Sequence, residues 1–158
     1  MKIIKYEQKY QPQIISLILH IQNEEAKINL HIEDQPDLLD IPKYYENNGG
    51  EFWIAIENEE VIGTIALMNY GNENGVLKKF LVRAERRSQK VGLALYQVFM
   101  QKVKEVGYQR ILLDTPSVAK ASRRFYEKSG FVRISKSDLP FRYEYADRNS
   151  LLYLLEIH

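Results

Sequence analysis

The chain has 158 residues, of which 45% are hydrophobic and 27% charged, as is typical of a globular domain that buries its own core. The formal net charge of +1 argues against nucleic acid or a membrane surface as a general partner. The absence of cysteine excludes a disulfide framework, a thiolate nucleophile and a cysteine-based metal site. Because no signal-like or membrane-spanning run is present, we expect one cytoplasmic domain over residues 1–158.

The first third of the chain contains a short strand, a helix and an acidic segment. Residues 2–6 are predicted to form a strand. Residues 11–23 carry apolar side chains at helical spacing, which predicts an amphipathic helix. Residues 24–36 are acidic and show little periodicity. We expect a second helix after them, with Asp34 or Asp37 as its N-cap.

Three strands of an antiparallel meander are predicted next. Residues 51–56 and 61–68 are apolar runs that flank a short polar turn, which is the pattern of a β-hairpin. A turn rich in glycine and asparagine at residues 71–75 then leads into an apolar run over residues 77–82. This third strand ends in a charged loop that opens directly into the longest predicted helix.

That helix has one broad apolar face. Val91, Leu95, Phe99 and Val103 recur every four residues, so they line one side of a helix. Ala94, Val98 and Val106 lie beside them and widen the apolar face. The pattern therefore predicts a helix that packs along the sheet.

The remaining elements complete an α/β domain. A strand over residues 111–115 should lie parallel to the 77–82 strand, because a helix joins them through a right-handed crossover. A further helix, capped by Ser117, and strands at residues 131–134 and 151–157 follow. The sequence thus predicts a mixed, mostly antiparallel sheet flanked by about four helices.

The junction between the 77–82 strand and the long helix has the character of an anion site. The first N–H groups of a helix have no internal partner, and the helix dipole adds positive potential there. Four cations, against the single acid Glu85, surround this helix start: Arg83, Arg86, Arg87 and Lys90. A phosphate-bearing ligand is the expected occupant.

Two motifs around these elements resemble one known family. Residues 87–92 read Arg-Ser-Gln-Lys-Val-Gly and fall on the (Arg/Gln)-x-x-Gly-x-(Gly/Ala) motif of the GNAT superfamily of N-acetyltransferases, with Val82 at the usual distance before them. Residues 125–131 read Phe-Tyr-Glu-Lys-Ser-Gly-Phe and match the family's (Leu/Phe)-Tyr-Glu-Lys-x-Gly-Phe signature. The motifs occur in order with a strand between them, so the core of the resemblance covers residues 77–131.

The resemblance implies a sheet that opens between its fourth and fifth strands and binds acetyl-CoA as cosubstrate. Backbone groups of Leu81 and Val82 would hold the pantetheine arm. The pyrophosphate would lie on the motif itself: Arg87, Ser88, Gln89, Lys90, Val91 and Gly92. Tyr126 would stand beside the acyl sulfur as general acid. The implied reaction transfers an acetyl group to a primary amine of a small molecule or peptide by direct attack in a ternary complex.

Three positions depart from the family pattern, and one of them is Ala119, where the family often has an asparagine seven residues before the tyrosine. Lys90 replaces the first glycine of the motif, and its N–H remains available to the ligand if the residue keeps a helical conformation. The acidic base of many family members corresponds to Val76. Other acidic side chains, or a water chain, are candidates to take the proton or to contact a cationic acceptor: Glu24, Glu25, Glu33, Asp34, Glu144 and Asp147.

Alternatives of other classes fit parts of the same pattern. A non-catalytic acyl-CoA sensor on the same fold is favoured by the missing base and by Lys90. An RNA-binding domain would use the basic loop, but the balanced charge argues against it. The histidines are dispersed and predict no metal site. A homodimer is compatible with either acyl-CoA function.

Overall fold

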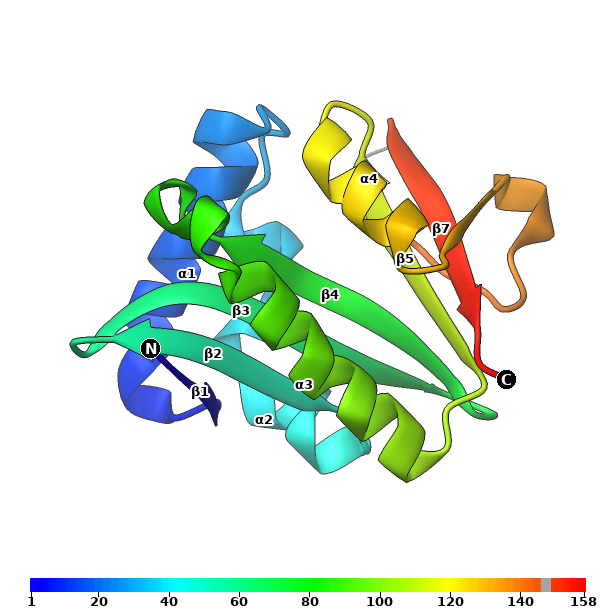
Figure 1. Cartoon of the computed structure of the whole chain (residues 1–158), viewed down its shortest axis with the longest axis horizontal. Coiled ribbons are helices and arrows are strands. Elements are labelled where there is room, and N and C mark those ends of the chain that lie inside the picture. Colours follow the sequence, from blue (N-terminus) through cyan, green and yellow to red (C-terminus); the bar gives the residue numbers. More distant parts are fainter. Residues whose placement is uncertain (146–148) are drawn as a thin grey trace.

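The computed structural model describes residues 1–145 and 149–158, apart from the side chain of Ser88. The strands of these residues form one seven-stranded sheet (Figure 1). The strand order is β1-β2-β3-β4-β5-β7-β6. The strands are β1 (Lys2–Lys5), β2 (Glu51–Glu57), β3 (Glu60–Gly71), β4 (Asn74–Val82), β5 (Arg110–Pro116), β6 (Val132–Ile134) and β7 (Ser150–Glu156).

Helices cover both faces of this sheet. Two of them, α3 and α4, lie on the near face in Figure 1, and α1 and α2 lie on the far face. The α-helices are α1 (Gln11–His20), α2 (Ile41–Tyr44), α3 (Val91–Val106) and α4 (Lys120–Lys128). Shorter helical turns are η1 (Gln8–Tyr10), η2 (Ile21–Glu25), η3 (Ile32–Asp34), η4 (Pro36–Leu39), η5 (Glu46–Asn48), η6 (Ala84–Gln89) and η7 (Lys136–Asp138).

The sheet divides between β4 and β5. Strands β1 to β4 are antiparallel, and so are the pairs β5–β7 and β6–β7. The parallel β4–β5 pairing joins residues 74–76 to residues 110–112. Beyond these pairs β4 continues to Val82 and β5 to Pro116, and the two strands diverge (Figure 1). The predicted mixed sheet, opened between its fourth and fifth strands, is confirmed.

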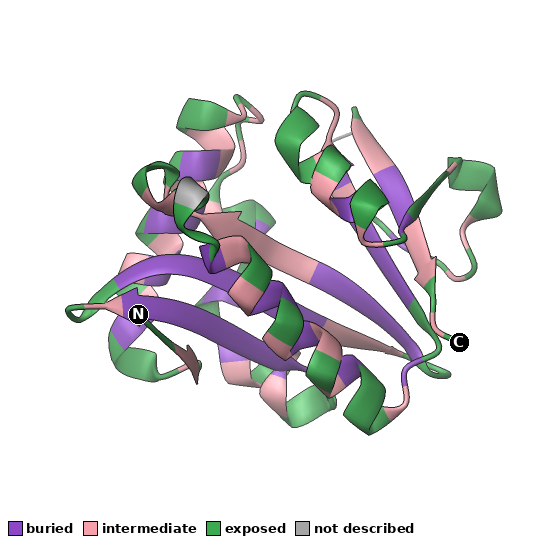
Figure 2. Cartoon of the chain, in the orientation of Figure 1, coloured by how far each residue is buried: buried purple, intermediate pink, exposed green. Residues whose placement is uncertain are grey.

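The main core lies between the sheet and the near-face helices. Leu95, Phe99 and Val103 on α3 are fully buried against β2 to β5, as the four-residue spacing predicts. Figure 2 shows the strands mostly buried and the outer side of α3 exposed. Deleting a ring such as that of Phe99 typically costs 3–5 kcal/mol, so this face anchors α3 firmly. In the part of the chain that the structure describes, no helix is both long and apolar enough to cross a membrane.

The two helix caps expected around residues 34–37 were wrong. Asp40 caps α2, its side chain accepting the Lys43 N–H at 3.4 Å. Asp34 instead accepts the His31 N–H (3.0 Å) at the start of η3. Asp37 is buried within η4, where its carboxylate accepts the Tyr45 hydroxyl. Pro36 opens η4 and Pro42 is the second residue of α2, and each lacks the N–H that a continuing helix would need, so no single long helix forms.

The expected start of α4 also differs from the structure. The helix begins at Lys120 with Ala119 in the N-cap position, and not after Ser117. The Ser117 carbonyl accepts a hydrogen bond from the guanidinium of Arg123 at 3.1 Å. Residues 117–119 therefore form a loop, closed by a contact from the helix that follows it.

Candidate active site

The basic loop and the start of α3 lie beside the opening of the sheet. Residues 84–89 form η6, and α3 begins at Val91. Lys90 between them has φ 61° and ψ 21°, the left-handed conformation. Lys90 therefore does not have the helical conformation that was the condition for its N–H to remain available to the ligand. Glycine adopts this backbone conformation most easily, and glycine is the residue that the family motif carries at this position.

Gly92 leaves the first turn of α3 open. A Cβ built there would lie 3.7 Å from Phe80 and from Val82, which is ordinary van der Waals contact. The fold itself therefore does not require glycine at position 92. The missing side chain instead lets a ligand approach the unpaired N–H groups of the helix start. The geometry of this turn fits a phosphate group.

The arginines of the loop already face carboxylates from other elements. Three pairs are formed: Arg83 with Glu60 (3.2 Å), Arg86 with Glu57 (3.6 Å) and Arg87 with Glu25 (2.5 Å). Gln89 lies next to Arg86, at 3.4 Å. The positive charge that the sequence predicts at this helix start is thus partly balanced in the folded chain. A phosphate bound there would share Arg87 with Glu25.

Along β4, the backbone N–H and C=O groups of every second residue point toward the opening of the sheet. Leu81 stands opposite Thr64, and the N–H of Arg83 donates to β3 at 2.8 Å. Since antiparallel residues alternate in direction, the backbone groups of Val82 point away from β3. Its carbonyl accepts the Nε–H of Arg87 at 3.0 Å. The register favours Val82 over Leu81 for a backbone contact with a ligand in the opening.

Tyr126 packs within the aromatic cluster on the near face. Its residue is 6% exposed, and its ring centroid lies 5.7–6.4 Å from four other rings: Phe80, Phe125, Phe131 and Tyr153. Burial raises the pKa of the Tyr126 hydroxyl well above its usual value, and the charge of Asp114 on β5 raises it further. The hydroxyl therefore carries its proton throughout the physiological pH range and is a donor.

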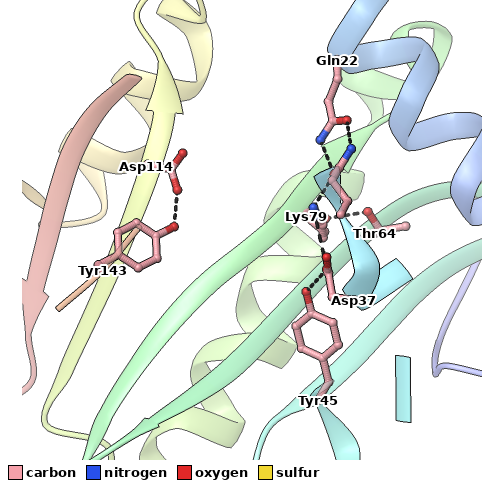
Figure 3. A network of polar contacts seen from close by, with 8 residues as sticks. Gln22, Asp37, Tyr45, Thr64, Lys79, Asp114 and Tyr143 are labelled. Atoms are coloured by element: carbon pink, nitrogen blue, oxygen red, sulfur yellow. Dashed lines mark hydrogen bonds and ion pairs between the residues drawn. The ribbon is translucent and has the colours of Figure 1, made fainter. Parts of the chain in front are cut away.

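The far face of the opening holds a polar network that sequence patterns did not reveal (Figure 3). Lys79 on β4 donates its Nζ–H to Gln35 Oε1 at 2.5 Å and lies 3.8 Å from Asp37 Oδ2. The same Asp37 oxygen accepts the Tyr45 hydroxyl at 2.6 Å. Gln22 on η2 exchanges two hydrogen bonds with Gln35. The signal available in the sequence was a pair of lysines inside an apolar strand.

Across the opening, β5 contributes a second polar pair. Asp114 accepts a hydrogen bond from the hydroxyl of Tyr143, a buried residue from the segment after η7 (Figure 3). Burial raises the pKa of Tyr143 strongly, with Asp114 adding to the effect, so its hydroxyl stays protonated. The ammonium of Lys78 lies 5.8 Å from the centre of the Tyr143 ring. Asp114 and Tyr143 were not singled out by any sequence motif.

Most acidic side chains considered as proton acceptors have other partners or lie at the surface. Glu25 pairs with Arg87 as described, and Glu144 pairs with Arg142 at 3.1 Å. Glu24 and Glu33 are exposed, and Asp147 lies outside the described residues. Among the residues that the structure describes, no three His, Cys, Asp or Glu side chains gather as metal ligands would.

A sheet that opens beside the start of a helix is the architecture that the GNAT resemblance implies. Comparison with known proteins shows the family directly: residues 15–131, more than half of the chain, match the acetyltransferase (GNAT) family model. The chain belongs to this family. Among curated relatives, the mouse protein named "Probable N-acetyltransferase family 8 member 5" is 29% identical over 107 residues, which are 65% of this chain and 47% of that protein. The chain spans about half the length of the curated relatives it matches.

Solved structures resemble the whole chain. An acetyltransferase from Streptococcus agalactiae 2603 is 38% identical, with a TM-score of 0.95 over 99% of this chain and 98% of that chain. A GNAT-family acetyltransferase from Staphylococcus aureus MU50 is 35% identical, with a TM-score of 0.94 over 98% of each. A PaiA N-acetyltransferase from Thermoplasma acidophilum, solved in complex with coenzyme A, shares the fold alone, with 16% identity and a TM-score of 0.74 over 99% of this chain and 98% of that chain.

Proposed function

We propose that this protein transfers an acetyl group from acetyl-CoA to a primary amine. The observation that carries the proposal is the divergence of β4 and β5 beside the open first turn of α3. The opening offers a strand edge to an extended ligand, and the helix start offers N–H donors to its phosphates. The coenzyme A complex of a protein with the same fold supports this placement.

Residues around the helix start are assigned to the phosphates. The N–H groups of Val91 and Gly92 would donate to the pyrophosphate, with Lys90 in the turn directly before them. Arg87 would add positive charge, shared between Glu25 and the ligand. Gln89 and Ser88 belong to the same loop. The backbone of Val82, together with Leu81 beside it, would hold the pantetheine arm along β4.

Tyr126 is assigned the role of general acid. The acceptor nitrogen, after losing its ammonium proton to water, attacks the thioester carbon, and the carbon–sulfur bond breaks. The departing sulfur takes the Tyr126 proton, and the second proton of the attacking nitrogen returns to Tyr126 through water. The products are the N-acetylated amine and free coenzyme A. Burial keeps Tyr126 protonated before the step, as a donor must be.

A non-catalytic acyl-CoA sensor is the second candidate. It is favoured by Val76, which is fully buried and apolar where many relatives of this family place an acidic base. The sensor would bind acetyl-CoA on the same residues but would release no coenzyme A when amines are added.

The test is a screen of amines with acetyl-CoA, following the release of free thiol. We expect at least one class of primary amine to be acetylated, with product confirmed by mass spectrometry. The panel includes amino acids, peptides, polyamines and aminoglycosides. Tight binding of acetyl-CoA by calorimetry without turnover of any amine would favour the sensor instead.

A further inference from the structure

The far face of the strand opening carries polar side chains for which the proposed acetyl-CoA site has no use. On one side lie Lys79, Asp37 and Gln35, and on the other Asp114 and Tyr143 (Figure 3). These side chains lie away from α3 and α4, which cover the near face. Lys79 and Asp114 are the partly exposed members of this set, whereas Asp37, Gln35 and Tyr143 are buried.

A bulge in β4 brings two successive lysines to this face. Lys79 has φ 52°, and the β3–β4 register shifts between Thr64 and Ala66. The hydroxyl of Thr64 holds the bulge by donating to the Lys79 carbonyl at 2.6 Å. In a regular strand, neighbouring side chains point to opposite faces. Here Lys78 lies by Tyr143 and Lys79 by Asp37, both on the far face.

The ammonium of Lys79 has hydrogen-bond donors that its partners within the described chain do not use. Its side chain is only 10% exposed, and its Nζ lies 3.8 Å from Asp37, beyond hydrogen-bond length. An ammonium has three donors, and Gln35 accepts one of them. Burial lowers the pKa of Lys79 to about 8 despite the opposing effect of Asp37. A further anion beside Nζ would therefore be bound favourably.

Stability alone does not account for a lysine at this position. Replacing a buried ion pair by apolar side chains of similar size is often neutral or stabilising. The Asp37–Tyr45 hydrogen bond already ties η4 to the segment after α2. A buried cation at the point where β4 leaves β5 is better explained by recognition of a charged ligand.

We propose that the acceptor amine carries an anionic group, which Lys79 and the neighbouring Lys78 bind on the far face of the opening. The amine nitrogen then lies toward Asp114 and Tyr143, whose oxygen atoms suit an amine. This inference deepens the proposed acetyl transfer and rests on it. The sequence offered several acidic side chains as contacts for a cationic acceptor. Two of them, Glu25 and Glu144, already pair with arginines.

The experiment uses matched amines with the wild-type protein and acetyl-CoA. Each amino acid is compared with the amino alcohol in which a hydroxymethyl group replaces the carboxylate, which preserves the primary amine. O-phosphoethanolamine against ethanolamine forms a second arm, which separates phosphate from carboxylate as the anion. We expect kcat/KM for the anionic member to exceed that of its neutral partner by about 10- to 100-fold, as for loss of a charge-assisted hydrogen bond.

Variants then connect the preference to the lysines. Lys79→Met should remove the preference mainly by raising KM, and Lys79→Arg should restore part of it. Lys78→Met, at a half-buried position, should lower it by a smaller factor. Lys104→Met on the exposed side of α3 is the matched control and should change nothing. Calorimetry should show the same acetyl-CoA affinity in all of these proteins.

The outcomes separate the inference from the function on which it rests. Neutral amines acetylated as well as their anionic partners by the wild type would overturn the inference and leave acetyl transfer standing. A preference that survives in folded Lys79→Met would overturn the assignment to that residue. No turnover with any amine would overturn the proposed function, and the inference with it.

Discussion

At the residue scale, two of the lysines whose backbone is left-handed, a conformation that side chains rarely adopt, lie beside the proposed site. Lys79 has φ 52° and Lys90 has φ 61°. A left-handed conformation costs a residue other than glycine about 1–2 kcal/mol. Both lie at places where the proposed reaction needs an unusual chain path: the bulge of β4 and the entrance of α3. Two of the strained positions of the described chain thus lie where the ligand is expected.

The buried Lys79 should give the stability of the protein a specific pH dependence. Its pKa is about 8 when folded and 10.5 as the ordinary value. Between these two values the unfolded chain binds the proton and the folded chain does not, so the free energy of unfolding should rise with pH. The slope is at most about 1.4 kcal/mol per pH unit. Below the folded pKa both states are protonated, and no slope arises from this residue.

Urea unfolding from about pH 7 to 10 measures this effect, with Lys79→Met as the reference protein. The difference in unfolding free energy between the two proteins should move in favour of the wild type as pH rises above the folded pKa. Parallel curves across the whole range would show that Lys79 has an ordinary pKa in the folded chain.

Tyr126→Phe should separate chemistry from packing. Phenylalanine preserves the ring contacts with Phe80 and Phe131 and removes only the proton donor. For a true general acid, kcat should fall by about 10²–10⁴-fold, with little change in affinity for coenzyme A. The assay uses an amine found in the screen. A stable Phe variant with wild-type kcat would show that Tyr126 is a packing residue.

At the scale of elements, the entrance of α3 combines an open helix turn with a loop whose charges are partly balanced. The glycine keeps the turn accessible, and Glu25 on η2 pairs with Arg87 across the loop. This contact links α1 and its π-helical extension η2 to the loop before α3. Affinity for phosphate here therefore depends on residues from two separate parts of the chain.

Gly92→Ala should weaken coenzyme A binding while leaving the fold intact. The added methyl group meets only ordinary contacts inside the protein, at 3.7 Å from Phe80 and Val82. Alanine also favours the helix, so the free energy of unfolding should rise by up to about 1 kcal/mol. Calorimetry should show weaker binding, and Gly92→Asp should weaken it further by charge repulsion. Unchanged affinity in both variants would place the phosphates elsewhere.

Glu25→Gln should strengthen coenzyme A binding. The substitution removes the carboxylate that shares Arg87 with the phosphate, 2.5 Å from the guanidinium. Because the pair is partly exposed, the expected gain is about two- to fivefold at low salt and smaller at high salt. Titration of coenzyme A at two salt concentrations checks this, with Glu24→Gln, an exposed neighbour, as control. Weaker binding in Glu25→Gln would mean that Glu25 positions Arg87 for the ligand.

At the scale of the whole molecule, two parts of the sheet meet through a short parallel pairing. Residues 74–76 and 110–112 join the β1–β4 part to the β5–β7 part, and beyond them the strands diverge. The proposed ligand would contact both parts, with α3 and β4 on one side and α4 on the other. Binding should therefore stabilise the molecule as a unit.

Acetyl-CoA should raise the melting temperature of the protein. At about 100 times the dissociation constant, binding adds about 2.7 kcal/mol of stability, which corresponds to about 5–10 °C for a chain of this size. Differential scanning calorimetry checks this, and adenosine serves as a control ligand without phosphate. No shift at millimolar acetyl-CoA would contradict acyl-CoA binding altogether.

The sequence by itself determined the order of the elements and the loop at the start of α3. Hydrophobic spacing over Val91, Leu95, Phe99 and Val103 predicted α3 because one face of a helix must be buried. The two family motifs placed the opening of the sheet correctly. These features depend on residues near one another in the chain, which is why local patterns were sufficient.

Only the tertiary structure determined which side chains meet on the far face of the strand opening and which carboxylates balance the arginines before α3. Lys79, Gln35 and Tyr45 become neighbours only when η4 packs against β4, and Asp114 meets Tyr143 over a separation of 29 residues. The pairing of Arg87 with Glu25 likewise joins segments that are distant in the chain. Pairwise contacts across such distances leave no periodic pattern in the sequence, because each partner has neighbours of an unrelated kind along the chain.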